Sequence, residues 1–282
     1  MDVKKTRRIV LLGKTGTGKS NLANTIFGEK VFTINHTFNS ETKKCQAGTR
    51  SVNGRSITLI DTPGFFDIDM SKKKLKNEMM RCITECAPGP HAFLIVLKVE
   101  RFSEQENDVI RKIYEYFSKE ALKYATVVFT HGDQLKEGMK IEECVSQNNH
   151  LRNLVKKCGG QCHVVDNKHW NNNRPNEYRS NQLQVAKLLN TIDKIVMENN
   201  EGYYTNEMLQ TVEREIQKEE ERIRLSSGNM TQEEIRQQAK RRVLEKLLIG
   251  LASAVAGVWL GAFLGVPGMV GIVGGFLRLF FS

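Results

Sequence analysis

The chain has 282 residues, which leaves room for one large domain plus an appendage, and its 40% hydrophobic content argues against bulk disorder. A net charge of +10 admits an anionic partner, but the basic residues are dispersed without aromatic interleaving, so we expect no nucleic-acid partner. Six cysteines are too few for a disulfide framework, and the first residues lack the apolar stretch of a secretory signal peptide.

A phosphate-binding loop follows the first predicted strand, residues 9–12. It reads Gly13-Lys14-Thr15-Gly16-Thr17-Gly18-Lys19-Ser20, the pattern Gly-x-x-x-x-Gly-Lys-Ser. Glycines allow the backbone N–H groups to turn towards phosphate oxygens, the lysine reaches the β- and γ-phosphates, and the serine hydroxyl joins a Mg²⁺ shell. A helix predicted over 20–27 opens directly after the loop, so its positive dipole end faces the anion, and we extend the predicted nucleotide contacts to Asn21.

Short apolar runs and helical stretches alternate as far as residue 202, which predicts an α/β fold with a mostly parallel sheet and helices on both faces. This 7–202 segment is the predicted nucleotide-binding domain. Ligands bind such sheets at the carboxyl ends of the strands. The expected strands are residues 9–12, 57–60, 92–97, 126–129 and 162–165; the expected helices are 20–27, 71–86, 103–117, 141–157 and 180–199.

The second nucleotide element is Asp61-Thr62-Pro63-Gly64, which follows the predicted strand 57–60. Asp61 there can hold Mg²⁺ through water, and the Gly64 N–H can sense a γ-phosphate. Thr42, in the polar segment before that strand, is our choice for a further Mg²⁺ ligand, with Thr37 and Ser40 as rivals. The predicted metal set is therefore Ser20, Thr42 and Asp61.

Base recognition is predicted in the loop after strand 126–129, which reads Thr130-His131-Gly132-Asp133. A carboxylate at Asp133 pairs with the N1–H and the exocyclic amine of guanine but not with adenine, which favours GTP over ATP and argues against an ATPase. His131 either stacks on the base or is solvated. Asn167, after the last strand, is predicted to contact the guanine carbonyl, and Trp170 covers the base or only packs.

Residues 203–246 form a charged helical extension by the same analysis. Apolar residues recur on one face of a first helix, typical of a solvated helix that packs one stripe, with coiling against a partner as the alternative. A capping box, Thr231-x-x-Glu234, predicts the start of a second helix that runs towards Lys246.

The final segment, 247–282, is strongly apolar, with 20 uncharged residues from Leu247 to Val266. That length matches the thickness of a bilayer core, and Lys240, Arg241, Arg242 and Lys246 precede it, which suits an approach from the cytosol to anionic headgroups. We expect a C-terminal anchor on the cytosolic face of an intracellular membrane, either spanning or as a hairpin. A buried helix pair packed on the α/β domain is the alternative.

The motifs together resemble the immunity-associated GTPase family (GIMAP or IAN) of the septin-like and chloroplast-import-receptor-like group. The resemblance covers about residues 7–205 and is carried by the phosphate loop, by 42–45, by 61–67 and by the stretch Leu97-Lys98-Val99-Glu100-Arg101-Phe102-Ser103-Glu104-Gln105-Glu106. It implies a P-loop GTPase domain that binds GTP or GDP with Mg²⁺, pairs with itself across the nucleotide face and acts in immunity. Many members carry the base-reading aspartate one residue later than Asp133.

Catalysis is expected to be slow. Small GTPases place a water-orienting glutamine directly after the Asp-x-x-Gly turn, where this chain has Phe65, which neither donates nor accepts a hydrogen bond. Arg101 is a candidate for a group supplied in trans on dimerisation, with an ordinary surface arginine as the alternative.

Two functions stay open: a membrane-anchored GTP switch with slow or dimer-assisted hydrolysis, and a GTP-bound scaffold that does not hydrolyse. The sequence names no protein effector.

Overall fold

The computed structural model describes residues 6–34, 44–64, 70–100, 117–172, 174, 177–226 and 228–252. Within them a six-stranded sheet has the order β2-β3-β1-β4-β5-β6. All neighbouring strands are parallel except the β2–β3 hairpin. The strands are β1 Arg7–Leu12, β2 Gln46–Val52, β3 Arg55–Asp61, β4 Ala92–Lys98, β5 Ala125–Thr130 and β6 Cys162–Val164.

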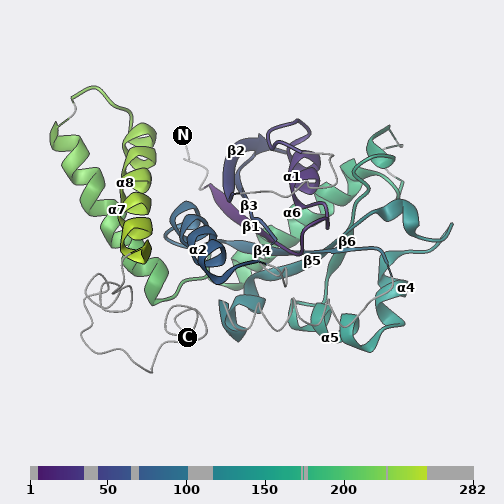
Figure 1. The fold of residues 1–282 in the computed structure, drawn as a ribbon. Helices are drawn as coiled ribbons and strands as arrows, with labels where there is room; N and C mark the ends of the chain where they lie inside the picture. The colour runs from purple at the N-terminus through teal and green to yellow at the C-terminus, as the bar shows by residue number, and fades with distance from the viewer. Residues whose placement is uncertain are drawn as a thin grey trace.

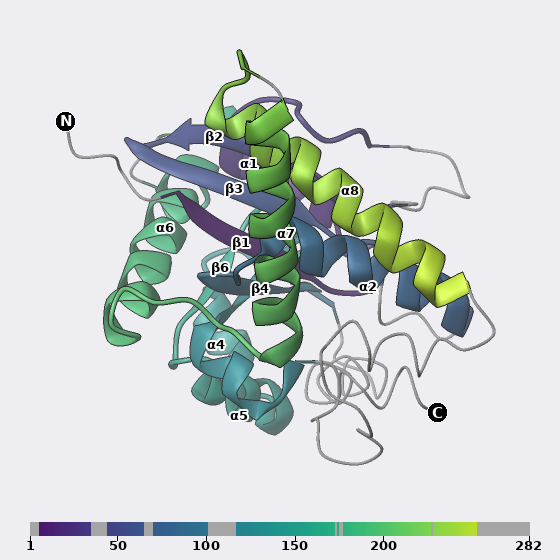
Figure 2. The ribbon, with the colours of Figure 1, turned by 90° about the vertical axis from the view of Figure 1, so that its left-hand side faces the viewer.

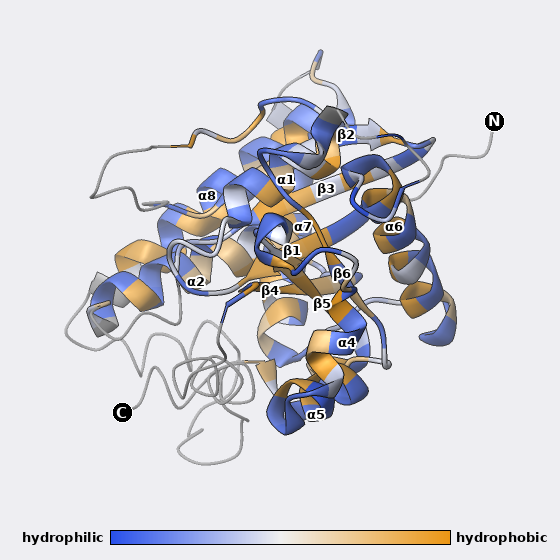
Figure 3. Ribbon diagram, turned by 90° about the vertical axis from the view of Figure 1, so that its right-hand side faces the viewer, coloured by the Kyte–Doolittle hydropathy of each residue, from blue (hydrophilic) through white to orange (hydrophobic). Residues whose placement is uncertain are grey.

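Helices cover both faces of this sheet, as predicted (Figure 1). Successive residues of β1 enter different cores: Ile9 belongs to the core that includes α1 and α6, and Val10 to the core that includes α2, α5 and the C-terminal helices. Strands buried on both faces are largely apolar, and Figure 3 shows the centre of the sheet mostly in the hydrophobic colour. The α-helices are α1 Lys19–Phe27, α2 Lys72–Cys86, α4 Ile141–Ser146, α5 Asn149–Lys157, α6 Asn181–Glu198, α7 Glu207–Ser226 and α8 Gln232–Ala252.

Two local expectations were wrong. Strand β2 was not predicted, because most of its residues are exposed and its sequence has no apolar run. The Asn53-Gly54 turn, with both residues at positive φ, is the hairpin signal that marks it. The single helix expected over 141–157 is two helices, because the Asn148 side chain accepts hydrogen bonds from the N–H groups of His150 and Leu151 and starts a new helix.

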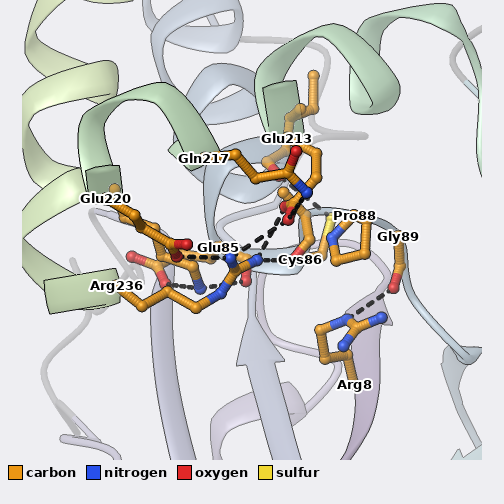
Figure 4. Close-up of polar contacts among 12 residues, drawn as sticks. Arg8, Glu85, Cys86, Pro88, Gly89, Glu213, Gln217, Glu220 and Arg236 are labelled. Atoms are coloured by element: carbon orange, nitrogen blue, oxygen red, sulfur yellow. Dashed lines mark hydrogen bonds and ion pairs between the residues drawn. The ribbon is translucent and has the colours of Figure 1, made fainter. Parts of the chain in front are cut away.

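The C-terminal helices α7 and α8 form a hairpin that packs on α2 (Figure 2). The capping box is confirmed: Thr231 N–H donates to Glu234 Oε2 at 2.8 Å, and Glu234 N–H donates to Thr231 Oγ1 at 3.3 Å. Arg236 of α8 lies between two carboxylates of α7, at 2.8 Å from both Glu213 and Glu220, and donates to the Ala87 carbonyl after α2 (Figure 4). The apolar face of α7, predicted to pack as one stripe, is therefore buried within the core of this chain.

Helix α8 runs through the predicted boundary at 246/247 and ends at Ala252, and Leu247 is fully buried in the core shared with α7 and α2. Among the described residues, no helix combines the length and the apolar character that crossing a bilayer requires. Most of the expected anchor, from residue 253 onwards, lies outside the described residues. Lys240 donates to the Glu85 carbonyl at 2.8 Å, so this basic residue is held by α2.

Candidate nucleotide-binding site

The phosphate loop connects the end of β1 to the start of α1, at the carboxyl edge of the sheet. Gly16 and Gly18 have φ of 80° and 81°, a region that glycine enters without strain, and Gly18 is the N-cap of α1. A Cβ on Gly13 would stand 2.5 Å from the Val96 carbonyl oxygen, so only glycine fits against β4. The sequence pattern and the fold thus place the loop where backbone N–H groups can face an anion.

The lysine of the loop is held over it. Lys19 is buried, and its ammonium donates to the carbonyls of Gly13 at 2.9 Å and Lys14 at 2.8 Å. Thr17 caps the same turn, with its hydroxyl donating to Lys14 O at 2.9 Å. A buried cation beside a helix N-terminus is suited to neutralise phosphate charge.

The predicted metal ligands Ser20 and Asp61 meet across the end of the sheet. The Ser20 hydroxyl donates to Asp61 Oδ2 at 2.5 Å, and Asp61 Oδ1 is buried without a hydrogen-bond partner. Burial raises the pKa of Asp61, and the Ser20 hydrogen bond and the charge of Lys19 oppose that rise. An orphaned carboxylate oxygen beside a hydroxyl fits a Mg²⁺ ion, a hard cation that prefers oxygen ligands. Thr42 lies outside the described residues; Gly64 follows Asp61 as a buried loop residue.

The base-reading loop is tied to the phosphate loop at the end of β5. Thr130 donates to the Thr17 carbonyl at 2.7 Å, a tie that the sequence analysis missed. His131 has a left-handed backbone with φ of 59°, and its ring approaches the Thr130 hydroxyl at 3.0 Å. Asp133 is exposed and lies beside a cavity of about 510 Å³, whose lining includes Asn21, Lys30, His131, Asp133, Asp166 and Asn167.

Asn167 and Trp170, from the loop after β6, have definite roles. The Thr25 hydroxyl of α1 donates to Asn167 Oδ1 at 2.8 Å, so Asn167 links the base cavity to the helix of the phosphate loop. Trp170 is buried against Gly132, and a Cβ on that glycine would stand 2.5 Å from its ring. Of the two possibilities for Trp170, packing is the one observed.

Arg101 and Phe65 fall outside the described residues, as do 101–106 of the family stretch. Among the described residues, no cluster of three or more His, Cys, Asp or Glu side chains forms a metal site. The structure therefore brings together the phosphate loop, Asp61, Asp133 and Asn167. The residue that sequence reasoning missed is Asp166, which precedes Asn167 and contacts the base-reading loop.

A family model for the AIG1 family matches residues 7–223. The chain belongs to the AIG1 family. This confirms the resemblance inferred from the motifs, and it includes most of α7 in the family unit.

Curated relatives agree with this assignment. Immune-associated nucleotide-binding protein 7 of Arabidopsis thaliana is 32% identical over 220 residues, which cover 76% of this chain and 69% of the relative. GTPase IMAP family member 8 of Homo sapiens is 31% identical over 221 residues, which cover 76% of this chain and 32% of the relative. The chain thus spans from about a third to about two-thirds of the length of these relatives.

Solved structures of Toc33 from Arabidopsis thaliana share the fold. A dimerisation-deficient mutant has a TM-score of 0.55 at 18% identity, covering 70% of this chain and 86% of that one. Toc33 in complex with Mg²⁺ and GMPPNP has a TM-score of 0.53 at 20% identity, covering 68% and 85%. The domain is therefore a P-loop GTPase fold with added C-terminal helices.

Proposed function

We propose that this AIG1-family chain binds GTP or GDP with Mg²⁺ at the loop 13–20. The observation that carries the proposal is the pairing of Ser20 with Asp61 beside the buried Lys19, because it leaves a carboxylate oxygen without a partner where a hard cation fits. Lys19 and the loop amides would hold the β- and γ-phosphates, and Ser20 and Asp61 would hold the metal, with Thr42 as a further ligand. Bound Mg²⁺ neutralises phosphate charge.

Guanine selectivity is assigned to Asp133. Its carboxylate lies beside the cavity at the carboxyl ends of β5 and β6, where His131 and Asn167 also line the wall. A carboxylate accepts from the N1–H and the 2-amino group of guanine, and adenine offers no such donor pair.

Hydrolysis is proposed to be slow in the monomer. Phe65 stands where small GTPases orient water with glutamine, and a phenyl ring cannot do so. For the chloroplast translocon components atToc33 and psToc159, dimerisation is important for GTPase activity. We extend that behaviour to this chain: two copies pair across the nucleotide face, and Arg101 of one copy acts on the GTP of the other. Phe65 also favours the second candidate, a GTP-bound scaffold that never hydrolyses.

The C-terminal segment is proposed to hold the chain at the cytosolic face of an intracellular membrane. The support is its composition, since 247–266 has no charge and the residues that follow carry only one, Arg278. Flotation with vesicles compares the full chain with a truncation after Ala252, which preserves α8. Equal flotation of both forms would reject the anchor.

Calorimetric titration with GTP and with ATP tests the nucleotide assignment. We expect clear preference for GTP and strong loss of both affinities in Lys19→Ala, because the buried ammonium is removed from the phosphates. Lys156→Ala, an exposed lysine on α5, is the matched control and should bind like wild type. Equal affinities for the two nucleotides would refute the assignment of guanine selectivity to Asp133.

Turnover measured against protein concentration separates the switch from the scaffold. A specific rate that rises with concentration supports dimer-assisted hydrolysis, and its loss in Arg101→Ala but not in Arg152→Ala, an exposed arginine on α5, supports action in trans. An arginine supplied in trans is worth about 10³–10⁵ in rate. Absence of turnover at every concentration favours the scaffold.

A further inference from the structure

Asp166 connects the two loops that form the base cavity. One of its carboxylate oxygens, Oδ1, accepts hydrogen bonds from the N–H groups of Lys168 at 2.9 Å and His169 at 2.5 Å. The other, Oδ2, accepts from the N–H of Asp133 at 3.2 Å. The side chain is buried, so water cannot readily replace a hydrogen bond that is lost there.

The Asp133 side chain is exposed, so the position of its backbone depends on that contact. Its carboxylate accepts from Gln134 Nε2 at 2.8 Å, and both side chains are exposed. The backbone of the loop is instead fixed by the loop after β6: Gly132 N–H donates to the Val165 carbonyl at 3.0 Å, and the next N–H donates to Asp166. The backbone that carries the base-reading carboxylate is therefore positioned by the loop after β6, from which Asp166 also lines the cavity.

Asp166 is itself anchored to α6. Its N–H donates to Asn181 Oδ1 at 3.1 Å, and Asn181 Nδ2 donates back to its carbonyl at 2.5 Å. Burial opposes ionisation of Asp166, but hydrogen bonding with Asp133 and with the backbone of His169 and Lys168 outweighs it and lowers the pKa. An ionised acceptor that is hydrogen-bonded to Asn181, the first residue of α6, gives the loop a fixed reference point.

We propose that Asp166 is a positioning residue for guanine recognition, acting through Asp133. The inference rests on the proposed preference of this chain for guanine. With Asp166 in place, Asp133 is held at the cavity wall, where its carboxylate can accept from the N1–H and from the 2-amino group of the base. Without it, the carboxylate samples other directions and the second contact is the first to weaken.

Asp166→Asn is the informative substitution. Its single carbonyl oxygen is drawn to the two N–H groups of Lys168 and His169, which leaves an NH₂ facing the N–H of Asp133, donor against donor. The ratio of GTP to inosine triphosphate affinity reports the aim of Asp133, because inosine differs from guanosine only in lacking the 2-amino group. We expect this ratio to fall towards one and GTP affinity to fall about tenfold, the loss of roughly one charge-assisted hydrogen bond.

The matched control is Asp193→Asn, the same chemical change on α6 at a residue paired with Arg55 at 2.7 Å, outside the cavity. It should leave the ratio unchanged. Asn181→Ala is a second variant, because it removes the anchor of Asp166 but keeps its carboxylate, and it should lower the ratio by a smaller factor. Thermal unfolding identifies any variant that does not fold, and a ratio of affinities is unaffected by a partly unfolded fraction.

The outcomes separate the inference from the proposed function. If wild type does not prefer GTP to ATP, guanine recognition itself fails. If wild type prefers GTP, and folded Asp166→Asn and Asn181→Ala keep the wild-type ratio of GTP to inosine triphosphate affinity, the positioning role is overturned. A lower ratio in both variants, with Asp193→Asn like wild type, is the result that supports it.

Discussion

The stability of this domain should depend on pH through His163 of β6, a buried residue that is not among those lining the base cavity. The Thr191 hydroxyl donates to Gln161 Oε1 at 2.6 Å, so its oxygen accepts from His163 Nε2–H at 2.9 Å, and the network assigns a neutral ring with the proton on Nε2. Burial and the charge of Lys187 lower the pKa of His163 from 6.5 to about 4.

Because the pKa of His163 is lowered by folding, the domain should lose stability as the pH falls. Above pH 6.5 the ring is neutral in both the folded and the unfolded chain, and its contribution to stability is complete. As the pH falls from about 6.5 towards 4, the unfolded chain takes up a proton that the folded chain refuses, so stability is lost. The full difference corresponds to about 3 kcal/mol, of which about 2 kcal/mol is lost by pH 5.

Urea unfolding at neutral pH and at about pH 5 measures this loss. His163→Gln keeps an N–H donor for Thr191 but does not titrate. Wild type should therefore lose about 2 kcal/mol more than the variant between the two pH values. His150→Gln, an exposed histidine on α5, is the matched control and should lose as much as wild type. Equal losses in wild type and His163→Gln would refute the reasoning.

Three further substitutions test the site and the C-terminal hairpin. Ser20→Ala removes the donor to Asp61 and should reduce the Mg²⁺-dependent part of GTP affinity about tenfold, measured by titration with Mg²⁺ and with EDTA. Gly132→Ala places a methyl 2.5 Å from the Trp170 ring and should lower both GTP affinity and the free energy of unfolding, the latter by about 2 kcal/mol, measured by titration and urea unfolding. Arg236→Gln leaves two α7 carboxylates without their cation and should lower the free energy of unfolding by about 2 kcal/mol, between the values for exposed and buried ion pairs.

Each of these has a control of the same chemistry. Ser146→Ala changes an exposed serine of α4, Gly228→Ala adds a methyl with no atom within 4 Å, and Arg224→Gln removes an exposed ion pair. All three should behave like wild type within about 0.5 kcal/mol. If a control variant loses as much affinity or stability as its test variant, the contact assigned to that test residue is wrong.

The parallel strands were predictable because each contains a buried apolar run, which is longest in β4. Strand β2 was not, since pairing with β3 and an Asn-Gly turn hold it in place rather than burial of its own side chains. Sequence alone also could not show that Asn148 divides one helix into two. An asparagine side chain starts a new helix only where it accepts hydrogen bonds from the backbone N–H groups that follow, and the structure is needed to see that contact.

The site shows the same division. Gly13 to Ser20 and Asp61 act through local chemistry that a motif records, and the structure places them together. Asp166 acts through contacts that exist only when the loops after β5 and β6 meet, 33 residues apart in the chain. The sequence showed that Asp166 directly follows a buried strand, but it did not show that Asp166 contacts Asp133.

The basic residues before the apolar segment bear on how the chain would bind a membrane. Lys240 is bound to Glu85, and both Arg242 and Lys246 pair with the buried Glu219 of α7, whose pKa is lowered chiefly by its hydrogen bond with Lys246. Cations already paired within the fold add little to the attraction of anionic headgroups, which is about 1 kcal/mol for each available basic residue. Of the four basic residues, Arg241 is exposed on α8. Membrane binding should therefore depend mainly on the apolar segment, and anionic lipid or added salt should change it by no more than about 1 kcal/mol. Flotation that requires anionic lipid would contradict this, and would imply that α8 leaves its place on α2 at the membrane.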